Sequence, residues 1–415
     1  MKGKSVVALV PCPDYEGERV AGAVARGFEL LEPEPLPTGK PVLLKPNMLR
    51  PSPPEKGVTT HPSVFSAVAR FLREKVADLV FGDSPNGIFA PQAAAERSGL
   101  AAEARALGIP LADFETEEEV RNPSGSQNRR FVIARGIVEA GAIVNLPRLK
   151  THSLTTITGA LKNIFGAVPG KRKAEFHIKH PDVEGFSRMI ADLNGLVRSR
   201  LVVMDAIRAM EGNGPSAGDL VDLGLLLFST DPVAVDAVCC RIVGVDPLSL
   251  PLIRIAQEIG VGNASPDAIE IRGARLADHA RARFAVPPRS LTEKIPGFLY
   301  RIAKDLLVAK PIIDDFLCVR CGECVKTCPT QPKALSQEPR NPRQGRGAMN
   351  PREYRGAMNP REYRGARNVP SAAPGGIPRY DYSLCIRCYC CQETCPEGAI
   401  SVQDAPLGGI FRNRK

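Results

Sequence analysis

The sequence predicts an α/β protein in two parts: a large domain built on a mostly parallel sheet, followed by a small, cysteine-rich α+β module. Short apolar runs alternate with helical patterns over residues 1–285, which is typical of a parallel sheet with helices on both faces. Nine of the 12 cysteines lie in two blocks near the C-terminus. The chain has 415 residues, 43% of them hydrophobic, which is enough for two or three domains with real cores.

Six apolar, β-branched runs are the predicted strands of the large domain. They are Ser5–Val10, Pro41–Leu44, Asp78–Phe81, Ala142–Leu146, Leu201–Met204 and Leu223–Phe228. Helices are predicted between them: one from Pro62 with Thr60 as its cap, others over Pro91–Leu107 and Val183–Val197, and one from Pro232 capped by Asp231. These elements make up the expected α/β domain at residues 1–285.

Two further segments complete the predicted organisation. Residues 286–315 are expected to be a helical connector, because apolar residues recur with helical spacing from Lys294 to Leu307. Residues 316–404 form the cysteine module, which contains a segment at 336–378 that is rich in Arg, Pro and Gly and poor in apolar residues. This segment holds two tandem copies of RGAMNPREY, too few and too short for a solenoid, and is expected to be a flexible insert.

The net charge of +10 is a weak indication of a nucleic-acid partner. Residues 331–380 hold ten Lys and Arg against three Asp and Glu, so +7 is concentrated in and around the insert. No recognised nucleic-acid-binding motif surrounds it, which makes nucleic-acid binding unlikely among the functions considered. No apolar stretch approaches 18 residues and the N-terminus lacks the apolar region of a signal peptide, so we expect no membrane span and a cytoplasmic location.

The spacing of the cysteines carries the chemistry. Cys-x2-Cys-x2-Cys-x3-Cys-Pro occurs twice, and this is the spacing of bacterial ferredoxins. The two copies are Cys318, Cys321, Cys324 and Cys328, then Cys385, Cys388, Cys391 and Cys395. Three closely spaced thiolates reach three corners of one 4Fe-4S cubane, while the fourth cysteine of the block ligates the other cluster. Two zinc knuckles are the alternative, but zinc needs neither a third thiol at this spacing nor the closing Cys-Pro.

We therefore expect two 4Fe-4S clusters. Cys318, Cys321, Cys324 and Cys395 would hold one, and Cys385, Cys388, Cys391 and Cys328 the other. The additional Cys390 is either a small residue packed beside a cluster or a redox-active thiol or alternative ligand. Cys239 and Cys240 lie in an apolar helical pattern and are expected in the core.

Polar side chains follow four of the predicted strands. Open α/β sheets bind ligands in the crevice at the carboxyl ends of their strands, so these side chains predict a site there. The candidate catalytic residues are Lys45, His61, Asp83, Lys150, His152, Lys162 and Glu211. The lysines would bind an anionic ligand, the histidines would carry protons or bind metal, and the two carboxylates would orient them or bind a cation. The turn Glu211–Gly214 could bring backbone amides to the ligand. Lys171–Lys173 is expected to be a solvated loop, and His177 a surface or satisfied histidine.

The series of motifs in the large domain resembles a known family. It consists of Lys45-Pro46-Asn47, Thr59–Pro62, Gly82-Asp83-Ser84, Asn145–His152, Gly159–Gly166, Glu211–Pro215 and Asp231–Asp236. Together they resemble the domain-of-unknown-function 362 family, many members of which carry a C-terminal ferredoxin module. Residues 314–404 resemble the two-cluster bacterial ferredoxins, with a departure in the 56 residues between Cys328 and Cys385, more than a compact ferredoxin needs. The resemblance implies the fold and the clusters, and no particular reaction.

Two functions follow from these expectations. The first is a redox enzyme, an iron–sulfur oxidoreductase that passes electrons between the ferredoxin module and a ligand in the crevice and is served by a redox partner protein. The alternative is an electron carrier or adaptor whose large domain binds a partner without chemistry. A deep crevice lined by the predicted lysines and carboxylates would favour the first, and a flat, apolar face would favour the second.

Overall fold

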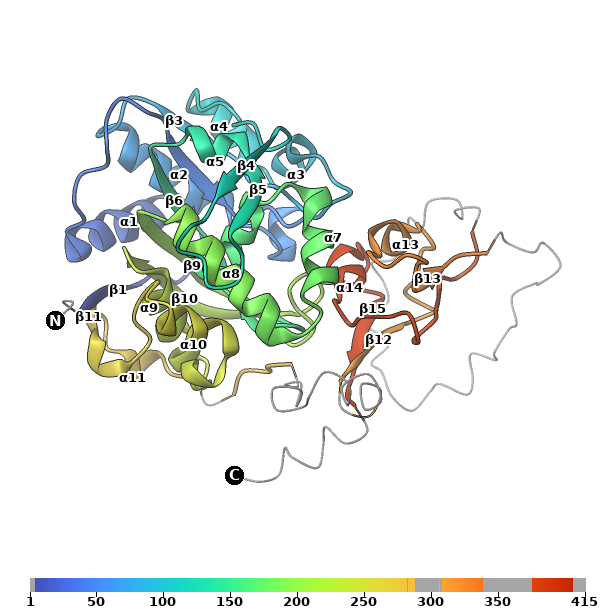
Figure 1. Cartoon of the computed structure of the whole chain (residues 1–415). Helices are drawn as coiled ribbons and strands as arrows, with labels where there is room; N and C mark the ends of the chain where they lie inside the picture. The colour runs from blue at the N-terminus through green and yellow to red at the C-terminus, as the bar shows by residue number, and fades with distance from the viewer. Residues whose placement is uncertain (1–3, 282, 288–305, 307, 339–374, 406–415) are drawn as a thin grey trace.

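The computed structural model describes residues 4–281, 283–287, 306, 308–338 and 375–405 (Figure 1). The predicted connector helix at 294–307, apart from Leu306, lies outside these residues, as do both copies of the nine-residue repeat. Among the residues described, no helix is both long enough and apolar enough to cross a membrane.

The large domain is built on a nine-stranded sheet. Its strands are β1 (Ser5–Pro11), β2 (Val42–Pro46), β3 (Leu79–Phe81), β6 (Ala142–Leu146), β7 (Arg148–His152), β8 (Thr156–Thr158), β9 (Leu201–Glu211), β10 (Asp219–Ser229) and β11 (Ile269–Gly273). The order is β11-β1-β10-β9-β6-β2-β3, and β7 pairs with β9 and with β8. Only β10 and β8 run antiparallel to their neighbours, so the sheet is mostly parallel, as predicted.

Helices cover both faces of this sheet (Figure 1). They are α1 (Gly17–Leu31), α2 (Pro62–Arg73), α3 (Pro91–Arg97), α4 (Leu100–Ala106), α5 (Arg135–Glu139), α6 (Ala160–Asn163), α7 (Gly170–Lys179), α8 (Val183–Val197), α9 (Pro232–Ile242), α10 (Pro251–Glu258) and α11 (Leu276–His279). Alternate residues of each strand enter opposite cores: Val7 and Leu9 pack with α8, α9 and α10, whereas Ala8 and Val10 pack with α1, α2 and α4. This explains why the strands are nearly continuous apolar runs.

Several local predictions need correction. His61, not Thr60, caps α2, because its ring nitrogen accepts the Ser63 N–H while the Thr60 hydroxyl donates to the Leu146 carbonyl at 2.6 Å. The helix expected over Pro91–Leu107 is broken into α3 and α4 at Gly99, whose φ of +78° a helix cannot accommodate. Asp231 caps α9 as predicted, accepting the N–H groups of Val233 and Ala234.

The predicted strand at Leu201–Met204 continues for seven more residues. Its sequence from Asp205 to Glu211 has no clear alternation, but β10 pairs with it antiparallel as far as Glu211. A hairpin of β4 (Glu117–Arg121) and β5 (Arg130–Ala134) was also not predicted. These strands form because they pair with a neighbouring strand, and the local sequence pattern alone does not indicate them.

The C-terminal module consists of two similar halves. Its elements are β12 (Lys310–Ile313), α13 (Glu323–Thr327), β13 (Leu335–Ser336), β14 (Arg379–Tyr380), α14 (Cys390–Thr394) and β15 (Ile400–Gln403). β12 pairs antiparallel with β15, β13 pairs antiparallel with β14, and α13 packs on α14. Figure 1 shows the module beside the large domain, with α14 next to α7.

Gln392 on α14 holds the module against the large domain. Its side-chain oxygen accepts from the Ser153 hydroxyl at 2.6 Å, and its backbone carbonyl accepts from Ser216 at 3.2 Å. Its side-chain nitrogen donates to Asn213, whose own amide nitrogen donates to the Ile400 carbonyl at 3.1 Å. The turn expected to bring amides to a ligand therefore docks the module instead.

Candidate functional site

The eight motif cysteines line two separate cavities in the C-terminal module. The first thiol cavity is lined by Cys318, Cys321, Cys324 and Cys395, and the second by Cys328, Cys385, Cys388 and Cys391. These are the two sets that the spacing predicts for two cubanes. Within the described residues no three His, Cys, Asp or Glu side chains are gathered so as to hold a single metal ion. The thiols instead surround cavities, and four soft sulfur donors around each fit a 4Fe-4S cluster.

Both cysteine loops reach this arrangement through the same backbone turns. Arg320 and Gly322 have φ of +61° and +74°, and the corresponding Arg387 and Tyr389 have φ of +60° and +61°. The left-handed turns on either side of the middle cysteine wrap each loop around its cavity. Tyr389 adopts this conformation without being glycine, and its hydroxyl donates to the Ala309 carbonyl at 2.7 Å, which holds it in place.

Polar groups also approach the sulfurs. The Ala399 N–H donates to Cys395 Sγ at 3.3 Å, and the Tyr380 hydroxyl lies 3.1 Å from Cys391 Sγ. Burial raises the pKa of the Cys324 thiol to about 12. Because a thiol ligates as thiolate, iron binding must release the protons that these buried sulfurs hold.

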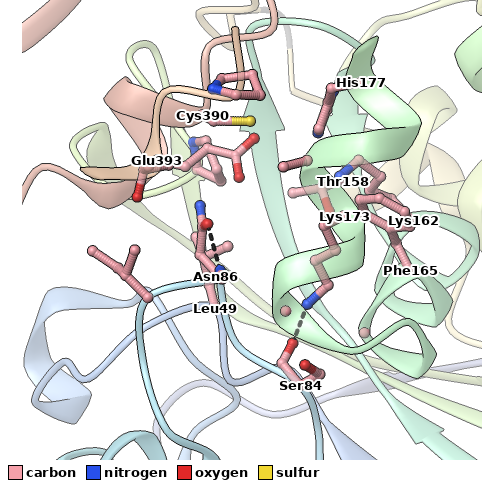
Figure 2. Close-up of a pocket in the computed structure, with 18 of the residues that line it drawn as sticks. Leu49, Ser84, Asn86, Thr158, Lys162, Phe165, Lys173, His177, Cys390 and Glu393 are labelled. Atoms are coloured by element: carbon pink, nitrogen blue, oxygen red, sulfur yellow. Dashed lines mark hydrogen bonds between the residues drawn. The ribbon is translucent and has the colours of Figure 1, made fainter. Parts of the chain in front are cut away.

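A third cavity, of about 310 Å³, lies between the large domain and the module, and we call it the interdomain cavity (Figure 2). The large domain contributes Asn47, Asp83, Lys150, His152, Lys162, Phe165, Lys173 and His177, among others. The module contributes Lys326, Cys328, Pro329, Lys333, Cys390 and Glu393, among others. Asn47 and Asp83 lie just after β2 and β3, and Lys150 and His152 lie on β7. The cavity is therefore at the carboxyl edge of the parallel strands, where α/β sheets bind ligands.

Four of the seven candidate catalytic residues line the interdomain cavity: Asp83, Lys150, His152 and Lys162. Lys45 lies directly behind Asp83, with its ammonium 2.7 Å from the carboxylate and 2.7 Å from the Asn163 carbonyl. Burial lowers the pKa of Lys45, and the neighbouring carboxylate opposes this effect. A Cβ on Gly166 would lie 1.8 Å from Asp83 Oδ1, so a glycine is needed beside this ion pair.

Lys150 and His152 follow the predicted strand at 142–146, and the structure places them on a further strand, β7. The ammonium of Lys150 donates to Asn47 Oδ1 at 2.7 Å and to the Val58 carbonyl at 2.6 Å. Burial lowers the pKa of Lys150 to about 7, and the nearby Arg148 adds to this effect. Such an amine exchanges protons near neutral pH.

His152 faces the module. Its Nδ1 accepts the Leu154 N–H at 3.0 Å, so the neutral ring carries its proton on Nε2, which lies 2.9 Å from the carboxylate of Glu393. Burial lowers the pKa of His152, and Lys162 acts in the same direction. Burial acts to raise the pKa of Glu393, but His152 and Lys162 outweigh it and lower that pKa to about 2. The pair is therefore a neutral imidazole beside an anionic carboxylate.

Lys162 packs on aromatic rings. Its ammonium lies 4.9 Å from the centre of the Phe165 ring and 5.4 Å from that of Phe186. Burial lowers the pKa of Lys162, and Glu393 opposes this. No protein acceptor within the described part of the chain hydrogen-bonds to this ammonium.

Of the lining residues that the sequence reasoning did not assign to the crevice, four bear directly on its chemistry. Lys173 and His177 lie on α7, four residues apart and so on one face. The Lys173 ammonium donates to the carbonyls of Ser84 and Pro85, and burial lowers its pKa to about 7. His177 stacks on Phe186 at 4.5 Å, and burial lowers its pKa to about 3. The expectation of a solvated loop around Lys173 was wrong, since the segment is helical.

The other two missed residues, Cys390 and Glu393, lie on α14 of the module, where their shared face is visible only once the module is docked. Figure 2 shows them across the cavity from His177 and Lys162. Cys390 is buried and lines the interdomain cavity, whereas the second thiol cavity is lined by its neighbour Cys391. Their spacing of three residues places them on one face of a helix, but the sequence does not tell which part of the protein that face contacts.

Besides Lys45, the candidates His61 and Glu211 lie outside the lining of the interdomain cavity. The His61 ring stacks on Tyr15 with centroids 3.6 Å apart, its backbone N–H donates to Asp205, and burial lowers its pKa to about 4. The Tyr15 hydroxyl donates to the same Asp205 carboxylate at 2.9 Å. Glu211 accepts the Ala285 N–H at 2.8 Å. The structure thus places these two residues in contacts that hold the fold together.

Comparisons with known proteins fit this architecture. Residues 42–241 match the model of a domain of unknown function, DUF362, and residues 310–396 match that of a 4Fe-4S dicluster domain. A thylakoid-associated protein of Synechocystis sp. is 34% identical over 234 residues, which cover 56% of this chain and 71% of that protein.

Two solved structures also align with part of the chain. The lactate racemase apoprotein from Thermoanaerobacterium thermosaccharolyticum aligns with 57% of this chain and 56% of its own, at 15% identity and a TM-score of 0.35. A Thermotoga maritima protein aligns over 60% and 59%, at 10% identity and a TM-score of 0.33. The aligned part of this chain thus spans little more than half of either protein. From the two family models and the 34% identical relative, the chain is an iron–sulfur protein that belongs to the DUF362 family and carries a C-terminal 4Fe-4S dicluster domain.

Proposed function

We propose that the protein is an oxidoreductase that holds two 4Fe-4S clusters and exchanges electrons with a small molecule bound in the interdomain cavity. One observation carries the proposal: Cys328 lines both the second thiol cavity and the interdomain cavity. A ligand in the interdomain cavity would therefore lie against a thiolate of one cluster. Electron transfer requires the ligand to lie close to a cluster, whereas a module with a purely structural role would have no such requirement.

The two thiol sets differ in their access to solvent. Each set has two buried thiols, but Cys321 in the first set is exposed whereas Cys388, its counterpart in the second, is only partly exposed. When bound by these thiolates, 4Fe-4S clusters exchange electrons one at a time. A redox partner protein would reach the first set from outside, and the second set would face the bound ligand.

The side chains of the cavity are suited to supply protons and to exclude water. Lys150, with a pKa of about 7, can give up a proton near neutral pH and regain it from solvent. His152 presents its Nε2 proton toward Glu393. Leu49, Phe165 and Pro329 add apolar surface to the lining, which reduces contact between water and a bound molecule.

The alternative, an adaptor without chemistry, predicts a flat and apolar surface at this edge of the sheet. The large domain instead contributes to a concave, partly open cavity lined by charged side chains from both parts of the chain. Buried lysines with lowered pKa values are a feature of functional sites more often than of docking faces. The geometry therefore favours an enzyme.

A cavity-filling variant tests the proposal. Holoprotein would be reduced anaerobically and mixed with small carbonyl and carboxylate compounds, with cluster reoxidation followed by visible absorbance. We expect saturable reoxidation by at least one compound, lost in Ala174→Trp, which fills the cavity from α7, and retained in Glu175→Trp, on the exposed side of the same helix. Equal reoxidation by the two variants, with both retaining iron, would contradict the proposal.

A further inference from the structure

The lysines around the interdomain cavity differ in whether their ammonium groups already donate hydrogen bonds to the protein. Lys150 donates to Asn47 and Val58, and Lys173 to the carbonyls of Ser84 and Pro85. Lys333 donates to the carbonyls of Val325 and Lys326, at 2.6 and 2.9 Å. These three ammonium groups are held by the protein itself, which fixes their positions.

Lys162 is different. It lies over the rings of Phe165 and Phe186, and none of its three donors has an acceptor within the part of the chain that the structure describes. The side chain of Lys162 is partly buried, and the faces of two rings offset only part of the cost of removing an ammonium from water. The donors of Lys162 are therefore available to a ligand.

The charge of the cavity points to the sign of that ligand. Its charged lining residues are Lys150, Lys162, Lys173, Lys326 and Lys333 against Asp83 and Glu393. Asp83 is already paired with Lys45, so Glu393, beside the neutral imidazole of His152, is the one lining carboxylate whose charge is not balanced by an adjacent ion pair among the described residues. The lining thus has an excess of positive charge, which an anion would balance.

The lining also indicates an organic anion. Leu49, Ile88, Phe165, Pro215 and Pro329 add apolar surface to the same cavity. A compact dianion such as phosphate is usually held by arginine forks or a nest of backbone amides, and no arginine is among the described residues that line this cavity. Lys326, the other lining lysine without an acceptor among the described residues, is exposed to solvent. The Lys162 ammonium, with its apolar neighbourhood, suits a single carboxylate on a carbon skeleton.

We propose that the interdomain cavity binds a small organic carboxylate, with the carboxylate group on the ammonium of Lys162. This deepens the proposed function, because it names the class of the substrate. Figure 2 shows Lys162 and Phe165 on one side of the cavity and Cys390 and Glu393 on the other. A carboxylate held at Lys162 therefore directs the rest of the molecule toward the module wall, where Cys328 borders the second thiol cavity.

Calorimetric titration of the oxidised holoprotein tests this inference without any redox step. The probes are acetate, pyruvate, crotonate and benzoate, each beside its neutral amide, and inorganic phosphate. At least one carboxylate should bind and its amide should not. Lys162→Met should weaken that binding about tenfold or more, since a charge-assisted hydrogen bond is lost. Lys162→Arg keeps the charge and should retain measurable binding, and Lys179→Met, which removes an exposed charge from α7, should bind as the unaltered protein does.

Several outcomes would overturn the inference: equal binding of acid and amide, unchanged affinity in Lys162→Met, preference for phosphate, or no binding by any carboxylate. The comparison of acid with amide uses the unaltered protein, so it decides the question even if a variant does not fold. Carboxylate binding without any cluster reoxidation would leave this inference standing and contradict the proposed redox function. Reoxidation of the clusters by amides as well as by acids would contradict this inference and leave the proposed redox function standing.

Discussion

The carboxylate of Glu393, on α14 of the module, lies 2.9 Å from the imidazole Nε2 of His152, on β7 of the large domain. Both side chains are buried. Glu393 is two residues from Cys391 and two from Cys395, one cysteine from each thiol set. This contact thus links the carboxyl edge of the sheet to both cysteine loops of the module.

This contact should contribute measurably to stability. In a double-mutant cycle with Glu393→Ala and His152→Ala, we expect a coupling energy of about 1–3 kcal/mol, because the two groups are in contact away from water. Denaturant unfolding of the holoprotein measures it. Glu397→Ala, at an exposed position of the same module, is the control and should change stability by less than about 0.5 kcal/mol. A coupling energy near zero would mean that the pair is not formed in solution.

Gly166 should be intolerant of any side chain. Its added Cβ would lie 1.8 Å from Asp83 Oδ1 and 2.7 Å from Lys45 Nζ, so Gly166→Ala must displace a buried ion pair. We expect a loss of at least about 2 kcal/mol in the free energy of unfolding. Gly22→Ala, in the exposed middle of α1 with nothing within 4 Å, should instead stabilise by about 0.5–1 kcal/mol. Similar effects from both substitutions would contradict the described packing.

The two thiol sets predict the metal content. Anaerobically purified protein should contain about eight iron and eight sulfide per chain. Cys328→Ser should damage the cluster of Cys385, Cys388 and Cys391 and spare the other, as iron analysis and electron paramagnetic resonance would reveal. Cys12→Ser, buried near β1 and far along the chain from both sets, should change neither value. About four iron per chain in the fully reconstituted protein, or stoichiometric zinc, would contradict the assignment of two 4Fe-4S clusters.

Carboxylate affinity should depend on pH. Burial lowers the pKa of both Lys150 and Lys173 to about 7, and a bound anion favours their protonated forms. Binding then takes up protons, so affinity should be full below a pH of about 7 and fall as the pH rises above it, by up to about tenfold per unit for each lysine that loses its proton. His177 and Glu393, with pKa values of about 3 and about 2, keep their charge states throughout this range. Calorimetry from pH 6 to 9 checks this, and affinity that rises with pH would contradict it.

Much of the fold could be predicted because local chemistry determines it. The apolar runs at β1, β2, β3 and β6 are buried on both faces, and their sequences alone indicate strands. The cysteine spacing defined two thiol sets, and the structure arranges the same sets around two cavities. The extension of β9 to Glu211 was missed because only its pairing with β10 stabilises it.

The site could be predicted only in part. Asp83 and Lys150 were found because they lie near the ends of strands, where α/β sheets bind ligands. Glu393 could not be found in this way, because its role depends on how the module docks. His61 was misleading, since a histidine just before a helix serves equally well as its cap, here stacked on Tyr15. Sequence position locates an edge of the sheet, whereas packing decides which side chains share a cavity.

The central claim is that a ligand in the interdomain cavity exchanges electrons with the cluster of the second thiol set. The most direct test is single-turnover reoxidation of the reduced protein by the tightest-binding carboxylate, compared between the unaltered protein and Cys388→Ala, in which only the second cluster is lost. The account predicts rapid, saturable reoxidation in the unaltered protein and its loss in Cys388→Ala, although the first cluster remains reducible. Reoxidation at an unchanged rate without the second cluster would contradict it.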